Sequence, residues 1–356
     1  MEVAQGYYQE ALGDANKAIQ LKSDSNAAFS TRGRAKQCLG KSKADQGDIE
    51  GAKELYNAAI ADHTKSIEIR PRSATAYNAR GWAKYLLGQL ETEQGNAPRA
   101  QKHYQAAIVD SDQAIRLAKD TYDAYSYYHT RGAVKAALGD YKKAIEDFNE
   151  AIRIKPTHIL SYQDRAKAKE ALGATDAAKA DLQKITQIHI DLAKNCFQEG
   201  QAKYQQHEYK AALACFDKAL MLNPKYAGAY SNRGMAKSAI GRSESRKRNR
   251  SQAQHHFQEA IADYTEAITQ NPKYASAYNN RGNAKYRLGL SESDSGNSEK
   301  AREHYQDAIT DLDKAIQLNP KHVKAHNNRG KVKKALGQQA AAEADYKKAK
   351  ALEAAD

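Results

Sequence analysis

The sequence predicts an all-α solenoid of two-helix hairpins stacked side by side, and three observations support this prediction. The phrase AYNNRG at 277–282 returns as AYSNRG at 229–234 and as AHNNRG at 325–330. The Gly that ends the phrase recurs at intervals of 34 or 48 residues along most of the chain. Six prolines, mostly between the recurring segments, and few β-branched runs suit helices. Self-similarity at a fixed period indicates stacked units without one central core.

The recurring Gly divides the chain into eight units and one half unit. A small residue occupies this marker position throughout, at Gly33, Gly81, Gly132, Ala166, Gly200, Gly234, Gly282 and Gly330. The successive spacings are 48, 51, 34, 34, 34, 48 and 48 residues. We therefore predict a half unit at 1–25, long units at 26–71, 72–121, 225–272 and 273–320, and short units at 122–156, 157–190, 191–224 and 321–356.

With these features the chain resembles the tetratricopeptide repeat family, whose helix-turn-helix unit has about 34 residues. The small marker residue and an Ala eleven or so residues before each unit-closing Pro fit the family pattern. The closing prolines are Pro71, Pro156, Pro224, Pro272 and Pro320. The resemblance covers nearly the whole chain and implies a right-handed superhelical solenoid of about 17 helices along 1–356.

The long units follow from adding one heptad to each helix of a short unit. A Leu-Gly pair such as Leu138-Gly139 ends the first helix of a short unit, since Gly suits a helix C-terminus. In long units a second Gly follows seven residues later, as Gly47 follows Gly40, and the second helix gains an Ala seven residues earlier. Seven residues are about two turns and restore the same helix face. The alternative is a disordered loop at each insertion, and the segment 242–251, without a turn Gly, fits the heptad least well.

The chain begins in the middle of a unit. Residues 1–22 match the second helix of a long unit, since Tyr8 and Ala11 align with Tyr305 and Ala308. We expect either that the chain is a fragment of a larger protein or that another chain covers the open apolar face of this helix.

Composition narrows the class of protein. Three cysteines, Cys38, Cys196 and Cys215, are too few for a disulfide framework and favour a reducing compartment such as the cytoplasm. No apolar run of about 18 residues predicts a membrane span. The net charge of +13 favours acidic partners. The basic run at 242–250 is interpreted as a solvated turn, an acidic-partner contact or a localisation signal, and it lacks aromatic residues for base stacking.

A charged pair recurs across the two helices of seven units. Arg precedes the marker and Asp stands at one position of the second helix, giving Arg32 with Asp62, Arg80 with Asp110, Arg131 with Asp147, Arg165 with Asp181, Arg233 with Asp263, Arg281 with Asp311, and Arg329 with Asp345. The eighth unit replaces both, with Glu199 and Cys215. A buried ion pair predicts that Arg and Asp are lost together, because either charge buried without the other destabilises the fold.

A Lys follows the Arg position by four residues in all eight units, on the same helix face. In the exceptional unit Lys203 is expected to pair with Glu199. Two interpretations stay open for this row. Either each ammonium meets a nearby carboxylate or carbonyl, or the eight ammonium groups line the inner wall and attract an acidic or phosphate-bearing ligand.

The family resemblance implies a concave groove, lined by first helices, that holds an extended peptide or a partner helix. The matching positions are Asn78, Trp82, Tyr85, Asn232, Met235, Asn279, Asn280, Asn283, Tyr286, Arg287, Lys324, Asn327, Asn328, Lys331 and Lys334. Asn side chains can bond a peptide backbone through donor and acceptor, although Asn also serves as plain polar surface. The family's clamp for a C-terminal carboxylate requires Lys where Asn279 stands, so that clamp is not expected.

No catalytic or metal-binding grouping is recognised. The eleven His are scattered, and the adjacent pair His255-His256 lacks the spacing with which a helix binds one metal. We expect no enzyme, no cofactor and no metal. The predicted function is a scaffold that binds a protein or a peptide, and an acidic partner is among those expected. The alternatives are a homo-oligomer assembled through unsealed terminal helices and long hairpins, and a basic binder of nucleic acid or another polyanion. The net charge of +13 would attract nucleic acid as well as acidic proteins, but a solenoid exposes much solvated Lys, so nucleic acid is the less expected partner. No membrane contact is expected.

Overall fold

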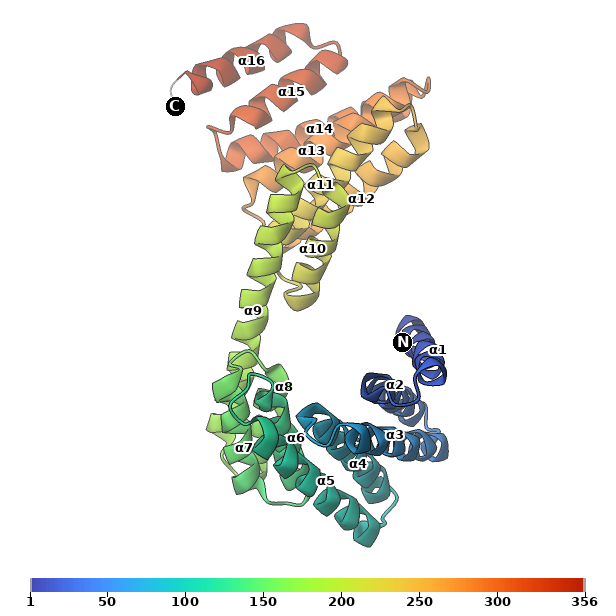
Figure 1. Cartoon of the computed structure of the whole chain (residues 1–356). Helices are drawn as coiled ribbons and strands as arrows, with labels where there is room; N and C mark the ends of the chain where they lie inside the picture. Colours follow the sequence, from blue (N-terminus) through green and yellow to red (C-terminus); the bar gives the residue numbers. More distant parts are fainter. Residues whose placement is uncertain (1, 355–356) are drawn as a thin grey trace. The chain divides into compact units, whose positions relative to one another are not determined.

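The computed structural model describes residues 2–354, and within this range the chain is helical with no strand (Figure 1). Residues 1, 355 and 356, which the predicted solenoid includes, lie outside the described residues, as do the side chains of residues 2–4. The prediction of an all-α protein is therefore confirmed for the described part of the chain.

The chain divides into two compact units, Met1–Ile188 and His189–Asp356. The helices that belong to the first unit are α1 (Glu2–Leu21), α2 (Asn26–Asp45), α3 (Ile49–Ile69), α4 (Ala74–Glu93), α5 (Ala97–Ala118), α6 (Ala124–Ala137), α7 (Tyr141–Ile154) and α8 (Ile159–Ala171). Those of the second unit are α10 (Tyr209–Leu222), α11 (Ala227–Arg246), α12 (Arg250–Gln270), α13 (Ala275–Ser293), α14 (Ser298–Leu318), α15 (Val323–Ala335) and α16 (Gln339–Glu353). Within each unit, every helix packs against the next in the chain.

The helix between these two sets corrects the predicted count. Helix α9 (Thr175–Gln205) runs without a break through the second helix of the unit at 157–190 and the first helix of the unit at 191–224. The described residues therefore form 16 helices where about 17 were predicted. The physical reason lies in residues 187–190, Gln-Ile-His-Ile, which lack the helix-breaking Pro that stands two residues after the ends of α3, α7, α10, α12 and α14.

The long insertions are helical arms. Helices α2, α3, α4, α5, α11, α12, α13 and α14 have 19–22 residues, whereas α6, α7, α8, α10, α15 and α16 have 13–15. The segment 242–251 follows the same plan, with Arg248 in the turn at a φ of 63°, where Gly47 and Gly95 serve in the other hairpins. The disordered-loop alternative is wrong for the described residues, because helices extend to the tip of each long hairpin.

Close contacts between Gly and an aromatic ring keep the two helices of a hairpin in register. A Cβ on Gly132 would lie 2.7 Å from the ring of Phe148, so only Gly allows the helices this approach. Each long hairpin has a contact of this kind one heptad beyond its marker Gly, as at Gly40, where a Cβ would lie 2.7 Å from Tyr56. Buried Ala residues fill the remaining space, so each hairpin contributes its own part of the core.

Candidate functional site

The Arg and Asp residues of the repeat meet in all seven predicted pairs. Each Arg donates two parallel hydrogen bonds to its Asp, and the Nη2–Oδ1 distances are 2.5 or 2.6 Å. The two residues are 16 positions apart in short units and 30 in long ones. One heptad on each helix accounts for the difference of 14, so lengthening the hairpin leaves the pair intact.

The Lys that follows each Arg binds the same carboxylate. In the seven units that carry the pair, the Lys Nζ lies 2.7–3.0 Å from the Asp Oδ2. These side chains are about four-fifths buried, and the Asp side chains are almost fully so. The seven ammonium groups are thus ion-paired within the repeats and are not a row of free charges facing a ligand.

Each of these Arg residues also contacts the preceding repeat. Its Nη1 donates to a side chain on the preceding second helix, as Arg131 does to Asp112 at 2.7 Å and Arg233 to Asp217 at 2.7 Å. In six of the seven units the guanidinium also lies over an aromatic ring one turn earlier, at 5.3–5.5 Å. One Arg therefore ties three helices together, which is a structural role.

The pKa values agree with this role. Burial acts to raise the pKa of Asp181 and Asp345, but hydrogen bonds from their Arg and Lys partners outweigh it, and both pKa values lie below the ordinary range. For Arg329 the hydrogen bond to Asp345 raises the pKa further above its ordinary value. These groups hold their charges and are not poised for acid–base chemistry.

The exceptional unit pairs differently from the prediction. The ammonium of Lys203 lies 2.7 Å from Glu208 Oε2, in the turn after the helix, and not on Glu199. Glu208 stands at the beginning of α10, where its carboxylate is free to meet an ammonium from the preceding helix. Cys215 occupies the place of the Asp, and burial raises the pKa of its thiol.

Two hollows lie along the first helices, one in each unit. The first, of about 460 Å³, lies between α2, α4 and the start of α6, and its wall includes Asn78, Trp82, Arg34 and Tyr125. The second, of about 570 Å³, lies between α11, α13 and the start of α15, and its wall includes Met235, Asn279, Asn280, Lys321 and Lys324. These are the positions where the family resemblance places a ligand.

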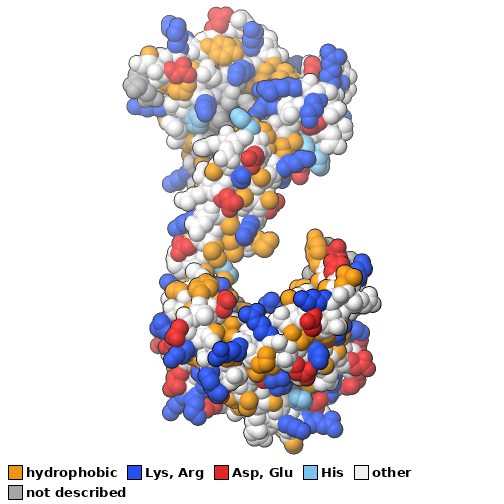
Figure 2. All heavy atoms as spheres, in the orientation of Figure 1, with side chains coloured by type: hydrophobic (Ala, Val, Ile, Leu, Met, Phe, Trp, Pro, Cys, Tyr) orange, Lys and Arg blue, Asp and Glu red, His pale blue; other side chains and the backbone are white. Residues whose placement is uncertain are grey.

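The two hollows occupy the same register of their units. Asn279 stands 201 residues after Asn78, and Met235 stands 201 residues after Arg34. Their chemistry differs, because the first hollow has Trp82 and the acidic Asp123 in its wall, whereas the wall of the second has two lysines and no acid. On the face shown in Figure 2, Lys and Arg side chains are spread among acidic ones over both units.

Three of the predicted Asn residues bind one another. The amide of Asn279 donates to Asn280 Oδ1 at 3.0 Å, and the amide of Asn328 donates to Asn279 Oδ1 at 2.9 Å. Asn279 is 3% exposed. Donor and acceptor on one side chain allow neighbouring Asn residues to satisfy each other, so Asn279 is not open to a peptide. By contrast, Asn78 Oδ1 is buried and has no hydrogen-bond partner in the described structure.

The other predicted groove residues lie away from the hollow walls. Tyr85 stacks on Trp82 at 5.0 Å and burial raises its pKa, while Tyr286 packs on Tyr305 at 5.7 Å. Asn232 bonds the carbonyl of Gly228 on its own helix. The predicted positions that do not line either hollow are Tyr85, Asn232, Asn283, Tyr286, Arg287, Asn327, Asn328, Lys331 and Lys334.

Sequence reasoning missed the residues that the connecting turns supply. Tyr125 lies in the first turn of α6, and Asn319 and His322 lie between α14 and α15, yet all three line a hollow. Arg34 was also missed. Arg34 directly follows the marker Gly33, as the predicted residue Met235 follows Gly234. Its position in the repeat was therefore enough to predict it as a groove residue.

Two negative findings concern the described residues. Within 2–354, no three or more His, Cys, Asp or Glu side chains gather as a metal site. In the same part of the chain, no helix is long and apolar enough to cross a membrane.

Family models match most of the chain. A model described as "TPR repeat" matches residues 200–241, 254–289 and 296–337. Three models described as "Tetratricopeptide repeat" match residues 39–93, 125–158 and 323–356. Together the matched residues make up well over half of the sequence.

Three curated proteins are similar over part of their length. Outer dynein arm-docking complex subunit 4 of Xenopus laevis is 27% identical over 29% of this chain and 20% of its own length. Small glutamine-rich tetratricopeptide repeat-containing protein 2 of Saccharomyces cerevisiae is 32% identical over 25% of this chain and 26% of its own. DnaJ homolog subfamily C member 3 of Homo sapiens is 31% identical over 33% of this chain and 22% of its own. The matches thus span about a quarter or less of each relative.

Proposed function

Because this chain belongs to the tetratricopeptide repeat family, we propose that it is a non-enzymatic protein-interaction scaffold whose two hollows each hold a segment of a partner protein. The observation that carries the proposal is Asn78. Its Oδ1 is a buried acceptor without a partner, in the wall of the first hollow. An unpaired buried polar atom costs about 1–3 kcal/mol. The residue as a whole is only half-buried, so a rotation of its amide would let a backbone N–H of an extended peptide supply the missing donor.

The first hollow suits a segment with an apolar or aromatic side chain. Trp82 and Tyr125 stand in its wall, and Trp82 is held in place by Tyr85 at 5.0 Å and His129 at 6.1 Å. Aromatic side chains fixed by their neighbours provide large contact area at low entropic cost. We propose an extended segment whose backbone binds Asn78 and whose side chain contacts Trp82.

The second hollow suits an acidic segment. Lys321 and Lys324 lie in its wall without a carboxylate beside them, and Asn280 lies on the opposite helix. The exposed ammonium groups are free to meet Asp or Glu of a partner, whereas the lysines of the repeat bridges are not. Charge at such a rim increases association rate and specificity more than affinity.

Selection from a random peptide library on the full chain tests the proposal. Enriched peptides are expected to fall into two sets, one for each hollow. Fluorescence anisotropy measures the affinity of each set for the protein and its variants. Trp82→Ala should weaken the first set at least about tenfold, as for an aromatic anchor. Lys321→Gln with Lys324→Gln should weaken an acidic second set and reduce its salt dependence. The control is Arg302→Gln, an exposed charge of α14 outside both walls. Peptides that bind all variants equally, or a library without enrichment, count against the proposal.

The alternatives have less support. Polyanion binding is the weaker candidate, because seven Arg and seven Lys of the repeats already bind Asp. The homo-oligomer stays a prediction, and light scattering over a range of concentrations tests it.

A further inference from the structure

One long helix extends beyond the helix that precedes it. Among the described residues, the long first helices α2, α4, α11 and α13 have 19 or 20 residues each. The second helices that precede α2, α4 and α13 have 20 or 21 residues, whereas α10, which precedes α11, has 14. The outer heptad of α11, about 10 Å long, therefore has no neighbour on the side of α10.

The chain itself covers the same face of other long first helices. Leu288 of α13 is buried against Ala253 and Phe257 of α12. Leu87 of α4 is buried in the same way in a cluster that includes Ala52 of α3. In both junctions a long second helix runs from the tip of its hairpin inward along the next first helix, and an aliphatic residue is removed from water.

A polar contact accompanies this packing. Glu292 accepts from Gln254 of α12 at 3.0 Å, and the corresponding Glu91 accepts from Lys53 of α3 at 2.8 Å. Gln254 and Lys53 each directly follow the Ala of the apolar contact. The covering helix thus presents the same pair in both cases, an Ala that packs and a hydrogen-bond donor one residue later.

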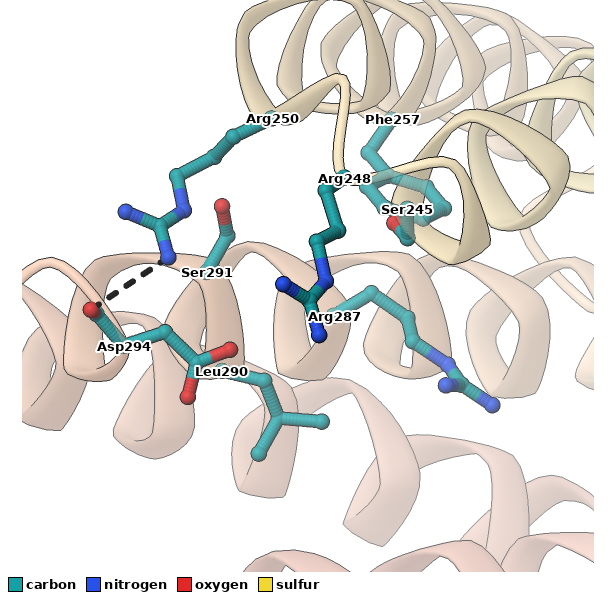
Figure 3. Close-up of a pocket in the computed structure, with 8 residues that line it drawn as sticks. All are labelled: Ser245, Arg248, Arg250, Phe257, Arg287, Leu290, Ser291 and Asp294. Atoms are coloured by element: carbon teal, nitrogen blue, oxygen red, sulfur yellow. Dashed lines mark hydrogen bonds between the residues drawn. The ribbon is translucent and has the colours of Figure 1, made fainter.

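Figure 3 shows the outer part of the covered junction between α12 and α13. Phe257 and Arg250 of α12 line one hollow of about 490 Å³ together with Ser291 and Arg287 of α13. Arg250 reaches across it and donates to the backbone carbonyl of Asp294 at 3.3 Å. Helix α12 therefore accompanies α13 to its tip.

Helix α11 carries this face without such a cover in the described structure. Ile240, Ser243 and Glu244 of α11 stand 48 residues before Leu288, Ser291 and Glu292 of α13. Spacings of three and four residues place them on one side of the helix, where they line a hollow of about 440 Å³ together with Lys247. Ile240 is only half-buried, whereas Leu288 is 4% exposed.

The turn between α9 and α10 closes the inner end of this hollow. His207, Glu208 and Tyr209 stand there. Their polar groups already have partners, because Glu208 accepts from Lys203 at 2.7 Å and His207 Nδ1 lies 2.8 Å from the hydroxyl of Tyr209. Tyr209 supplies a ring at the position of Phe257, so what this junction lacks is the outer turn with the Ala and the donor.

We propose that the hollow on α11 holds the C-terminal end of a helix from a partner protein. The partner helix takes the place and the direction that α12 has on α13, with a small residue against Ile240 and Ser243 and a Gln beside Glu244. Gln suits this place because its amide donates to the carboxylate while its oxygen accepts from Lys247, which lies 2.8 Å from Glu244. Removal of the exposed part of Ile240 from water favours docking.

The end wall decides which part of a helix fits. A helix that runs inward along α11 meets the α9–α10 turn after about two turns, so its C-terminus lies in the hollow. Its last carbonyls then face the N-terminus of α10, where negative partial charge is favoured. None of the residues in this wall belongs to the two hollows along the first helices, so the site is an additional one.

The probe for this site is a stapled helical peptide of Ala, Glu and Lys that ends in Arg-Ser-Gln-Ala-Gln, the sequence of residues 250–254. Fluorescence anisotropy measures its affinity for the full chain. Ile240→Gln should weaken binding at least about fivefold, and Ser243→Trp, which fills the hollow, at least about tenfold. Leu172→Gln is the matched control, because Leu172 is an exposed aliphatic residue at the end of α8, and it should leave the affinity unchanged.

A second peptide with Glu in place of the last Gln tests the polar contact. It brings a carboxylate beside Glu244 and should bind at least about fivefold more weakly than the first peptide. The proposal is overturned if the first peptide does not bind, if Ile240→Gln and Ser243→Trp leave its affinity unchanged, or if the two peptides bind equally.

Sedimentation velocity of the full chain tests for a different occupant. Self-association that Ser243→Trp abolishes would assign the hollow to a second copy and overturn a separate partner, whereas equal behaviour of the two proteins supports the proposal. Trp82→Ala should leave the affinity for the helical peptide unchanged, so this site and the first hollow are tested independently.

Discussion

At the scale of single residues, the Arg of each repeat is the most connected polar group of the chain. In the unit of Arg281, Asp311 accepts two of its hydrogen bonds, Thr265 of the preceding repeat accepts a third, and Tyr278 lies under its plane. A guanidinium with these partners is buried without an unpaired donor facing the core. The fold therefore tolerates the charged ladder in the seven units that carry it.

The first prediction concerns this ladder. Arg281→Ala leaves the Asp311 carboxylate, 5% exposed, with Lys285 alone, and we expect a loss of stability of about 3–5 kcal/mol. Arg281→Leu together with Asp311→Leu should recover much of the loss, since an apolar pair replaces an ion pair of similar volume. Lys285 keeps an acid in reach, with Asp307 Oδ2 at 3.6 Å. Urea unfolding of Arg281→Leu, Asp311→Leu and the double variant measures the coupling. Strictly additive costs contradict the bridge.

The second prediction concerns His63, whose ring packs on Gly33 with both nitrogens buried and unpartnered. Burial lowers the pKa of His63 from 6.5 to about 4. A group with a depressed folded-state pKa contributes stability that is present above the unfolded-state value, and this stability is lost as the pH falls from 6.5 towards 4. Phe148 and Phe216 occupy the same place against Gly132 and Gly200.

His63→Phe should therefore stabilise the protein and flatten its acid response. The substitution should raise the free energy of unfolding more at pH 4.5 than at pH 7.5, and the difference between the two gains is on the order of 3 kcal/mol. Urea midpoints at the two pH values measure it. His255→Gln serves as the control, because His255 is exposed. An unchanged pH profile in His63→Phe would show that the ring is not held neutral by burial.

At the scale of helices, the heptad is the unit by which hairpins lengthen. The pair Arg80–Asp110 is separated by 30 positions and the pair Arg131–Asp147 by 16, with the same geometry in both. A heptad added to one helix alone leaves two helical turns that pack against nothing. A heptad added to both helices extends the surface over which they are in contact. This explains why the long helices come in pairs, α2 with α3, α4 with α5, α11 with α12 and α13 with α14.

The third prediction follows from this pairing. Deleting residues 88–94 and 100–106 together converts the unit at 72–121 to the short design and brings Arg80 and Asp110 to a separation of 16. We expect this protein to retain more stability than either single deletion, although it loses twice as many residues. Circular dichroism melting curves of the three variants provide the measurement. A paired deletion that costs the sum of the two single ones contradicts the heptad interpretation.

At the scale of the whole molecule, the net charge of +13 has two different origins. Each Arg–Lys–Asp triad carries a net +1, so the seven triads hold seven of the thirteen charges inside the repeats. Part of the remainder lies at the α11–α12 turn and at the second hollow, as Arg248, Arg250, Lys321 and Lys324. Composition alone does not distinguish charges held in ion pairs within the repeats from exposed charges without an acidic partner. Only the exposed charges attract a ligand.

The two units also share a plan and differ in detail. Each contains two long hairpins followed by a short one, offset by 201 residues in the long pair. The shared positions keep the fold, as Gly40 and Gly241 do against Tyr56 and Phe257. The positions that differ, such as Leu86 against Arg287, line the hollows. Duplication thus supplies an internal reference for each proposed site.

The fold was largely predictable because its signals are local and repeated. The marker Gly, the Arg–Asp pair and the turn Gly each recur several times, so one misread unit does not change the period. Helix α9 was mispredicted because residues 187–190 lack the Pro that follows most of the other second helices. The candidate site was less predictable, since Tyr125 enters a hollow from the start of α6 and His322 from the turn before α15, outside the positions that the family pattern marks.

The sequence by itself determined the all-α class, the lengths of the hairpins and the partners in the ladder, because helix periodicity and paired substitutions are readable along one dimension. Only the tertiary structure decided which polar groups are satisfied. Asn279 is committed to Asn280 and Asn328, Asn78 has a buried acceptor without a partner, and Arg287 lines a different hollow from these residues. Satisfaction of a donor or acceptor depends on neighbours brought together from distant repeats, and that information is three-dimensional.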